Sequence, residues 1–409
     1  MATTERLYYT DSHLTEFQAR VINITPRVSG RVGVTLDRTA FYPTGGGQLS
    51  DTGTLAGASV IECIDEGEAG VLHLIQGAGP QIGQTVTGRI DWPRRLDHLQ
   101  QHTAQHILSQ AFIQLFGAET RSFRMMQETS EIDVALNDPS TERISRAVEL
   151  ANKVVWENRP VRVHKEVAPA EAARMNLRKR PTRQENLRLI EIEGFDLNAC
   201  GGTHARATGE VGMIAVRSWE RAKGLTRIEF VAGGRALIDY EKVNQTAREV
   251  ASLFSIARDE AVRSVHKLLE DHKQITRRLR ILEEAAVGIE ADEIYREAAQ
   301  PGDGVKVTLI KRIFHARSAE SLKQLARALI VHPKTIALLG VHEAAGDARL
   351  IFARSSDADG DMNTLMREAC TTIGGRGGGR ADLAQGGGRC DVERLAKVIE
   401  IAAHKLESG

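Results

Sequence analysis

The 409-residue chain has few cysteines, no excess of either charge and no long apolar run. Four cysteines are too few for a disulfide framework in a chain of this length, which indicates a reducing compartment. No stretch approaches the roughly eighteen apolar residues of a membrane span, and the N-terminus lacks the pattern of a signal peptide. Lys plus Arg and Asp plus Glu both number 54, so there is no global positive field. We therefore expect a cytoplasmic chain with roughly two to four domains.

Metal-binding side chains occur in two short motifs that lie far apart in the sequence. His102 and His106 are four residues apart, and so are Cys200 and His204. On a helix, four residues span about one turn, so both side chains of a pair leave the same face and can bind one ion. Three imidazoles and a thiolate form a ligand set that suits Zn²⁺. The two motifs together therefore predict one zinc site.

Two neighbouring residues refine this interpretation. His98 stands one turn before His102, and we expect it to be a solvated helix residue and not a further ligand. Thr103 follows His102 at the position where a metalloprotease would need Glu as the general base. The protease pattern is therefore not met.

The hydrophobic pattern predicts a multidomain protein of the α+β and α/β classes. We expect a β-barrel over residues 1–90, a two-layer α/β zinc-binding domain over 91–235, a helical coiled-coil segment over 236–300 and an α/β domain over 301–409. Short alternating runs broken by Gly and Pro indicate the barrel. Alternation of strand and helix patterns indicates the last domain.

The helical segment carries apolar residues at the 3-4 spacing of a coiled coil. One series recurs every seven residues: Phe254, Ala261, Leu268, Ile275, Leu282 and Ile289. The second series is Val265, Leu279 and Ala286, with His272 filling one turn. Such a seam needs a partner, either a helix of the same chain or a second subunit.

Two glycine runs and one basic run are the remaining candidate sites. The first glycine run is Gly45, Gly46 and Gly47, between Pro43 and Gln48; we predict a loop that approaches the substrate, because glycine has no side chain to obstruct it. The second run contains Arg376 and Arg380 and is interpreted as an anion-binding loop, with a mobile linker as the alternative. The basic run comprises Arg174, Arg178, Lys179, Arg180 and Arg183, with Arg188 beyond it. Because this run adjoins the metal motifs, we predict that it contacts phosphates, although such runs are often solvated surface.

Blocks along nearly the whole chain resemble alanyl-tRNA synthetases and the free-standing alanyl-tRNA editing proteins of the AlaX type. The stretches Gln101–Ser109 and Phe195–His204 resemble the editing domain, Tyr42–Gln48 its glycine-rich loop and Gly224–Gly233 the segment after its metal site. The stretches Gly374–Gly379 and Ala384–Gly388 resemble the C-terminal domain shared with DHH-type phosphoesterases. No aminoacylation domain precedes Leu7 and no Gly-Lys-Ser/Thr phosphate loop is found, so we expect a long-form editing protein acting in trans.

The resemblance implies a substrate, a cofactor and roles for particular residues. The substrate would be mischarged tRNA(Ala), carrying serine or glycine, and Zn²⁺ would be bound by His102, His106, Cys200 and His204. Thr44 is the candidate for recognising the serine hydroxyl. Gln48 and Asp196 would orient water or the amino group, or serve as structural hydrogen-bond partners. A homodimer through the coiled coil and the C-terminal domain is also implied.

Two other functions remain open on the sequence. The threonyl-tRNA editing domain has a similar ligand set, but it typically has Gly-Pro before the last ligand, where this chain has Gly202 and Thr203. A non-catalytic, zinc-stabilised protein that binds tRNA or dimerises is the second alternative. Four protein ligands allow it, because they give the closed tetrahedral site typical of structural zinc.

Overall fold

The computed structural model describes residues 4–26, 30–179, 186–299, 306–315, 317–343 and 346–408. The chain divides into two compact units, Met1–Arg258 and Asp259–Gly409, each with its own hydrophobic core. The four domain boundaries drawn from the sequence stay a prediction.

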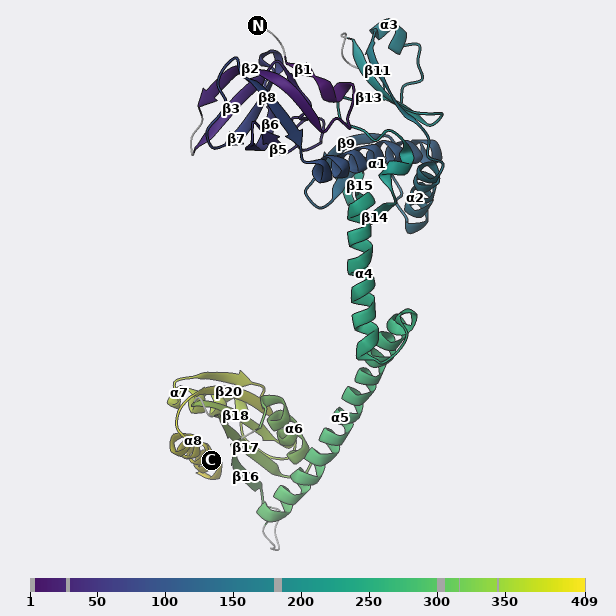
Figure 1. Cartoon of the computed structure of the whole chain (residues 1–409). Helices are drawn as coiled ribbons and strands as arrows, with labels where there is room; N and C mark the ends of the chain where they lie inside the picture. Colours follow the sequence, from purple (N-terminus) through teal and green to yellow (C-terminus); the bar gives the residue numbers. More distant parts are fainter. Residues whose placement is uncertain are drawn as a thin grey trace. The chain divides into compact units, whose positions relative to one another are not determined.

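The first unit begins with a closed six-stranded barrel (Figure 1). Its strands follow one another around the barrel as β2 (Glu16–Pro26), β3 (Arg31–Leu36), β7 (Val71–Gln76), β6 (Ala58–Asp65), β5 (Gly53–Leu55) and β8 (Thr85–Ile90). Burial alternates along the start of β2, so Phe17, Ala19 and Val21 fill the interior while their neighbours face solvent. Short pieces flank the barrel: β1 (Glu5–Arg6) pairs with β4 (Arg38–Thr39), and the 3₁₀ helices are η1 (Leu7–Tyr9) and η2 (Gly67–Ala69). The predicted barrel is confirmed.

Helices packed on a sheet form the middle of this unit, as the two-layer prediction required. Helix α1 (Trp92–Phe116) starts at Asp91, whose side chain accepts a hydrogen bond from the Arg94 N–H, and ends at the left-handed Gly117. Helix α2 (Thr141–Trp156) is capped by Ser140. The sheet order is β14 (Ile214–Ala222), β15 (Leu225–Ala232), β10 (Ser130–Val134) and β9 (Thr120–Met125).

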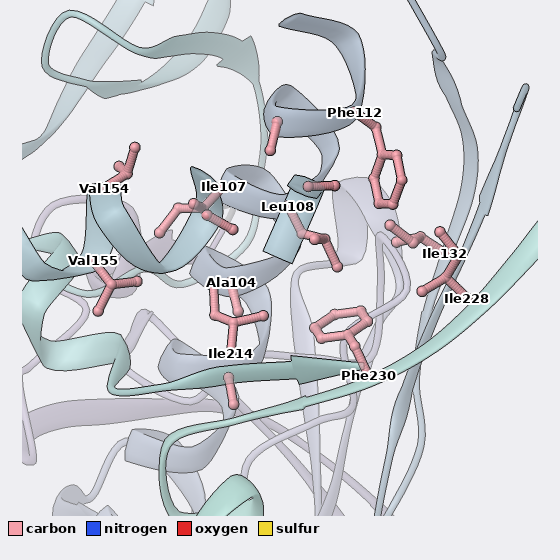
Figure 2. Close-up of a cluster of buried hydrophobic side chains, with 14 of the residues drawn as sticks. Ala104, Ile107, Leu108, Phe112, Ile132, Val154, Val155, Ile214, Ile228 and Phe230 are labelled. Carbon is pink, nitrogen blue, oxygen red and sulfur yellow. The ribbon is translucent and has the colours of Figure 1, made fainter. Parts of the chain in front are cut away.

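Figure 2 shows the core between these layers. Ile107, Leu108 and Phe112 of α1 and Val154 and Val155 of α2 lie with Ile132, Ile228 and Phe230 of the sheet. A separate small sheet consists of β11 (Val161–Val167), β12 (Leu187–Ile192) and β13 (Asp196–Ala199), with α3 (Pro169–Ala172) and η3 (Thr208–Val211) nearby in sequence. Because the apolar side chains of α1 between Ala104 and Phe112 pack in this core, the helix is held in place and its polar side chains have defined positions.

The seven-residue apolar spacing does not correspond to one continuous helix. Helix α4 (Gly233–Leu253) ends the first unit and α5 (Ala261–Ala298) begins the second, with the 3₁₀ turn η4 (Arg258–Glu260) before α5. The interruption includes Ser255, whose φ of 55° is left-handed and incompatible with an α-helix.

Most of the predicted seam on α5 is exposed. Val265, Leu268, Ile275, Leu279 and Leu282 are all exposed within the described residues of the chain. The buried residues of α5 are Ala261 at its start and Val287, Ala291 and Ile294 near its end, and the last three lie in the core of the second unit.

The second unit is a five-stranded sheet with helices on both faces. Its order is β16 (Thr308–Phe314), β17 (Thr335–His342), β18 (Asp347–Arg354), β20 (Leu383–Arg389) and β19 (Arg376–Gly379). Strands β16 and β17 are parallel, joined through α6 (Ala319–Leu329), and the other pairs are antiparallel. Helices α5 and α6 share one core, whereas α7 (Met362–Thr372) and α8 (Val392–Ser408) share another. None of the helices in the described ranges is long and apolar enough to cross a membrane.

The second glycine run forms two paired strands, β19 and β20, and not the predicted loop. Glycine is needed there because the hairpin lies directly on α7: a Cβ at Gly377 or Gly386 would approach Cys370 Sγ to 2.6 or 2.3 Å. The side chains of Arg376 and Arg380 are exposed at this hairpin.

A buried ion pair joins the barrel to α1. The Arg95 side chain is fully buried and its guanidinium forms a bidentate contact with the Asp51 carboxylate. It also donates to the carbonyl oxygens of Ser12 (2.7 Å) and Ala40 (2.6 Å). Asp51 Oδ2 in turn accepts a 2.6 Å hydrogen bond from the Tyr42 N–H, so the same carboxylate closes the base of the first glycine loop.

We predict that Arg95→Met destabilises the first unit by about 3–5 kcal/mol, because it leaves the buried Asp51 carboxylate unpaired. The three tryptophans, Trp92, Trp156 and Trp219, all lie in this unit, so fluorescence during urea denaturation reports its unfolding. Arg121→Met is the matched control, because the Arg121 side chain is exposed at a surface pair with Glu119. A loss below about 1 kcal/mol for Arg95→Met would contradict this interpretation.

Candidate metal centre

Four metal-binding side chains lie together where α1 meets the chain that follows β13. His102 and His106 leave one face of α1, and Cys200 and His204 come from the segment after Ala199. Their donor atoms all lie within 4.8 Å of one another. Cys200 Sγ is 3.4 Å from His102 Nε2 and 3.3 Å from His204 Nε2. The structure thus brings all four sequence-predicted ligands together.

The second motif reaches the cluster without being helical, contrary to the spacing argument. The described chain between Cys200 and His204 is an irregular turn. Gly202 passes so close to α1 that a Cβ there would lie 2.2 Å from His102 Cε1. A side chain at position 202 would therefore displace the imidazole, and glycine is required at this point.

Each imidazole of the cluster is oriented by a hydrogen bond at its Nδ1. His102 Nδ1 lies 2.7 Å from Gln48 Oε1, and His106 Nδ1 lies 3.0 Å from Asp196 Oδ2. His204 Nδ1 lies 3.3 Å from the hydroxyl of Thr103. Partners of this kind fix the ring orientation and leave Nε2 as the metal-binding nitrogen.

The chemistry of the donor set fits a zinc ion. Burial alone would raise the pKa of the Cys200 thiol, but the imidazoles of His102 and His204 lower that pKa well below its ordinary value. The thiolate, which is the form that binds metal, is therefore favoured. The Gly202 N–H also donates to Sγ (3.3 Å). One thiolate and three imidazoles, each hydrogen-bonded at Nδ1, match the ligands of zinc sites.

The first glycine run delivers Gln48 to this cluster. Gly45 and Gln48 exchange two backbone hydrogen bonds (3.1 and 2.9 Å) and so close a tight turn. Gly46 and Gly47 have positive φ values of 58° and 82°, which glycine adopts at little cost. Gln48 itself is 1% exposed and ends at His102, so its amide holds an imidazole and does not face solvent.

The other two predicted catalytic residues lie in contrasting surroundings. Thr44 is exposed, and its hydroxyl accepts a 3.1 Å hydrogen bond from the Ser50 N–H. Asp196 is buried, and its carboxylate contacts Nδ1 of His106. It therefore lies on the opposite side of the ring from Nε2, the nitrogen left for a metal ion. Its position suits the orientation of His106 better than direct contact with a substrate.

The structure divides the basic run between interior and surface. Arg178 is nearly buried: its guanidinium donates to the His106 carbonyl (3.0 Å) and lies 3.4 Å from Asp196 Oδ1. Arg174 and Lys179 are exposed. Arg180 and Arg183, also predicted to bind tRNA, lie outside the described residues.

Comparison with known proteins shows which family the chain belongs to. A family described as "Threonyl and Alanyl tRNA synthetase second additional domain" matches residues 187–229, and the DHHA1 domain family matches residues 306–408. Alanyl-tRNA editing protein AlaX-L of Pyrococcus horikoshii is 31% identical over 99% of this chain and 98% of its own length. The chain belongs to the AlaX-L family of alanyl-tRNA editing proteins.

Alanine–tRNA ligases match this AlaX-L family member as well. The ligase of Pyrobaculum neutrophilum is 30% identical over 98% of the chain, which spans 44% of the ligase's length. The solved C-Ala domain of Aquifex aeolicus alanyl-tRNA synthetase aligns over all of its own length and 27% of the chain, at 24% identity and a TM-score of 0.24. A superposition this weak carries no structural conclusion.

His98 is buried and not solvated, which corrects the sequence-based expectation. It is 1% exposed and burial lowers its pKa to about 3, so the ring is neutral. Its Nδ1 has no hydrogen-bond partner among the described residues and lies 3.9 Å from Asp51 Oδ1. His98 stands beside the barrel contact and is not part of the metal-binding group.

Two threonines that support the candidate ligands were not predicted from the sequence. Thr103 holds His204, and Thr203 contacts Gln48 through both its hydroxyl (2.8 Å) and its N–H (3.2 Å). Both threonines stand directly beside a ligand in sequence, which was the available signal. Their partners, however, come from distant segments and appear only in the fold.

We predict that Asp196→Asn weakens metal affinity about 10–100-fold, because the carboxylate that orients His106 is lost. Competition with a chromophoric chelator measures the affinity. The control is Asp11→Asn, since Asp11 is a half-exposed carboxylate that pairs with Arg206 and is not among the partners of the four candidate ligands. Equal affinities for Asp196→Asn and the wild type would show that Asp196 does not position a ligand.

Proposed function

We propose that this chain hydrolyses the ester bond of mischarged tRNA(Ala), acting on seryl-tRNA(Ala) first and glycyl-tRNA(Ala) second. Water enters the reaction, and free tRNA and the free amino acid leave it. The observation that supports this proposal most is the group formed by the buried His102, His106 and His204 with the half-buried Cys200. It is found in a chain that matches an alanyl-tRNA editing protein over nearly its full length. Such an activity belongs in the cytoplasm, where tRNA is charged.

In this proposal the four residues hold Zn²⁺, and the chain's other residues arrange the site. When bound, zinc supplies Lewis acidity toward an ester carbonyl or a hydrolytic water. Gln48 and Asp196 keep the imidazoles of His102 and His106 turned toward the ion. The turn formed by Gly45, Gly46 and Gly47 lets the ester approach, because it presents backbone and no side chains.

Thr44 is proposed to recognise the serine hydroxyl. Because its oxygen accepts the Ser50 N–H, the hydroxyl proton remains for donation to a ligand. The discrimination needed to spare alanyl-tRNA favours such a contact. A pocket that only tolerates an added hydroxyl discriminates about a hundredfold, whereas one that hydrogen-bonds it reaches roughly 10⁴–10⁵.

The exposed cations are proposed to bind the tRNA phosphates. Arg174 and Lys179 flank Arg178, which contacts the His106 carbonyl. Arg376 and Arg380 lie at the C-terminal hairpin. Among the described residues, Arg380 pairs with Asp382 at the surface (3.1 Å, with the Arg380 side chain 82% exposed). Salt screens such an interaction, and a phosphate can replace it.

Two alternatives remain distinct from this proposal. Threonyl-type editing would show hydrolysis of seryl-tRNA of the threonine type in preference to the alanine type. A non-catalytic zinc-stabilised protein would bind tRNA and protect its ester from hydrolysis. Assays with both tRNAs, with and without a chelator, therefore separate the three functions.

We predict that Cys200→Ala lowers the rate of seryl-tRNA(Ala) deacylation more than about a hundredfold, because it removes a ligand and not only a ligand's support. Cys390→Ala is the matched control, since Cys390 is also a half-buried free cysteine. Undiminished deacylation by a folded Cys200→Ala variant would contradict the proposed site.

We predict that Thr44→Val lowers deacylation of seryl-tRNA(Ala) and leaves alanyl-tRNA(Ala) spared, so the serine-to-alanine rate ratio falls toward about a hundred. Thr44→Ser keeps the hydroxyl and serves as the control. If Thr44→Val retains the full ratio, another group must recognise serine.

We further propose a homodimer in which the exposed apolar residues of α5 are covered by a second copy. A charge placed in the seam should then separate the subunits, because an unpaired buried charge is costly. We predict that Ile275→Glu is monomeric by light scattering after size exclusion, whereas Arg263→Ala, outside the seam, keeps the wild-type mass. A monomeric wild-type protein at the same concentration would exclude this dimer.

A further inference from the structure

Arg188 lies on β12 and directs its side chain at the turn that carries Cys200. Its Nη1 donates to two carbonyl oxygens of that turn, Cys200 O at 2.7 Å and Gly202 O at 2.9 Å. Its Nε donates to the Tyr9 carbonyl at 3.2 Å, and the guanidinium carbon lies 5.2 Å from the centre of the Tyr9 ring. Its Nη2 is buried without a hydrogen-bond partner among the described residues.

These contacts are incompatible with the phosphate contact that the sequence suggested for Arg188. A guanidinium that binds a tRNA phosphate must present a free edge to solvent. Here two nitrogens are engaged with carbonyl oxygens, and the third is enclosed. The surface cations of the basic run are better placed for phosphate.

The turn depends on Arg188 because it lacks regular backbone bonding. The Cys200 N–H donates to the Arg188 carbonyl at 3.1 Å, so the main chain and the side chain of Arg188 both hold Cys200. In the parts of the chain that the structure describes, no backbone N–H donates to the carbonyl of Cys200 or Gly202. One guanidinium nitrogen can bridge two carbonyls because Nη1 carries two N–H groups that the planar guanidinium holds in fixed directions, while Nε anchors the group to Tyr9.

We infer that Arg188 is a positioning residue of the metal centre: it fixes the Cys200–Gly202 turn through both carbonyls and so sets the direction of the thiolate. The inference rests on the metal centre of the proposed function. It also explains why a charged side chain is placed beside Cys200. The carbonyl dipoles and the nearby thiolate offset the cost of burying the cation.

Titration of the full-length protein with Co²⁺, followed by the thiolate-to-metal absorption band and by competition with Zn²⁺, tests this inference. We expect Arg188→Met to weaken metal binding about 10–100-fold and to shift or broaden the band, because the thiolate is no longer held in one direction. Arg188→Lys keeps the positive charge but not the fork, so we expect a deficit of about tenfold to remain. Arg162→Met is the control, since Arg162 is exposed on the neighbouring strand β11 and pairs with Glu193.

Wild-type affinity and an unchanged band in folded Arg188→Met would overturn the inference. Arg188→Lys decides the question if Arg188→Met does not fold: full affinity with lysine would mean that charge alone suffices, which also overturns it. A wild-type protein that shows the thiolate band but no deacylation would refute the proposed function and leave the role of Arg188 intact. A wild-type protein without the band would refute the metal centre and this inference together.

Discussion

The contact between Asp51 and Arg95 is the constraint on which the arrangement of the metal centre depends. Arg95 lies two turns before His102 on α1, and Asp51 closes the loop whose tip carries Gln48. Because one helix holds the base of the loop and receives its tip, Gln48 reaches the His102 imidazole. A buried ion pair contributes little net stability compared with apolar residues of the same size, so we infer that this pair serves mainly to fix the register of barrel and helix.

The four side chains of the candidate metal centre are held in place by other residues of the chain. One pair of candidate ligands comes from α1, and the other comes from the turn that carries Cys200. Cys200 lies 98 residues after His102 in the sequence. Each imidazole has a hydrogen-bond partner at Nδ1, and Arg188 donates to the turn that carries Cys200. Support of this kind reduces the conformational freedom that the ligands lose when an ion binds.

The sequence was sufficient for those features that depend on local spacing. Alternating apolar residues predicted the barrel, and the paired spacing of His102, His106, Cys200 and His204 predicted the metal-binding group. The helical reading of the second pair was wrong because spacing alone does not distinguish a helix from a turn that passes close to α1 at Gly202.

Two kinds of feature could not be predicted: strands made largely of glycine, and contacts between residues far apart in the sequence. The strands β19 and β20 are rich in glycine, so they show no alternation of side chains and resembled a loop. Arg178 and Arg188 looked like surface cations because their partners, the carbonyls of His106 and Cys200, are brought to them only by folding. His98 appeared solvated for the same reason, since the Asp51 carboxylate beside it comes from a segment far earlier in the sequence.

X-ray absorption at the zinc edge of the purified full-length protein tests the central claim most directly. We predict one zinc per chain, bound directly by one sulfur and three imidazole nitrogens. We also expect Cys200→Ala to lose the sulfur signal and Cys390→Ala to keep it. Zinc bound only through nitrogen and oxygen, or a protein that retains no stoichiometric metal, would contradict the claim that His102, His106, Cys200 and His204 share one ion.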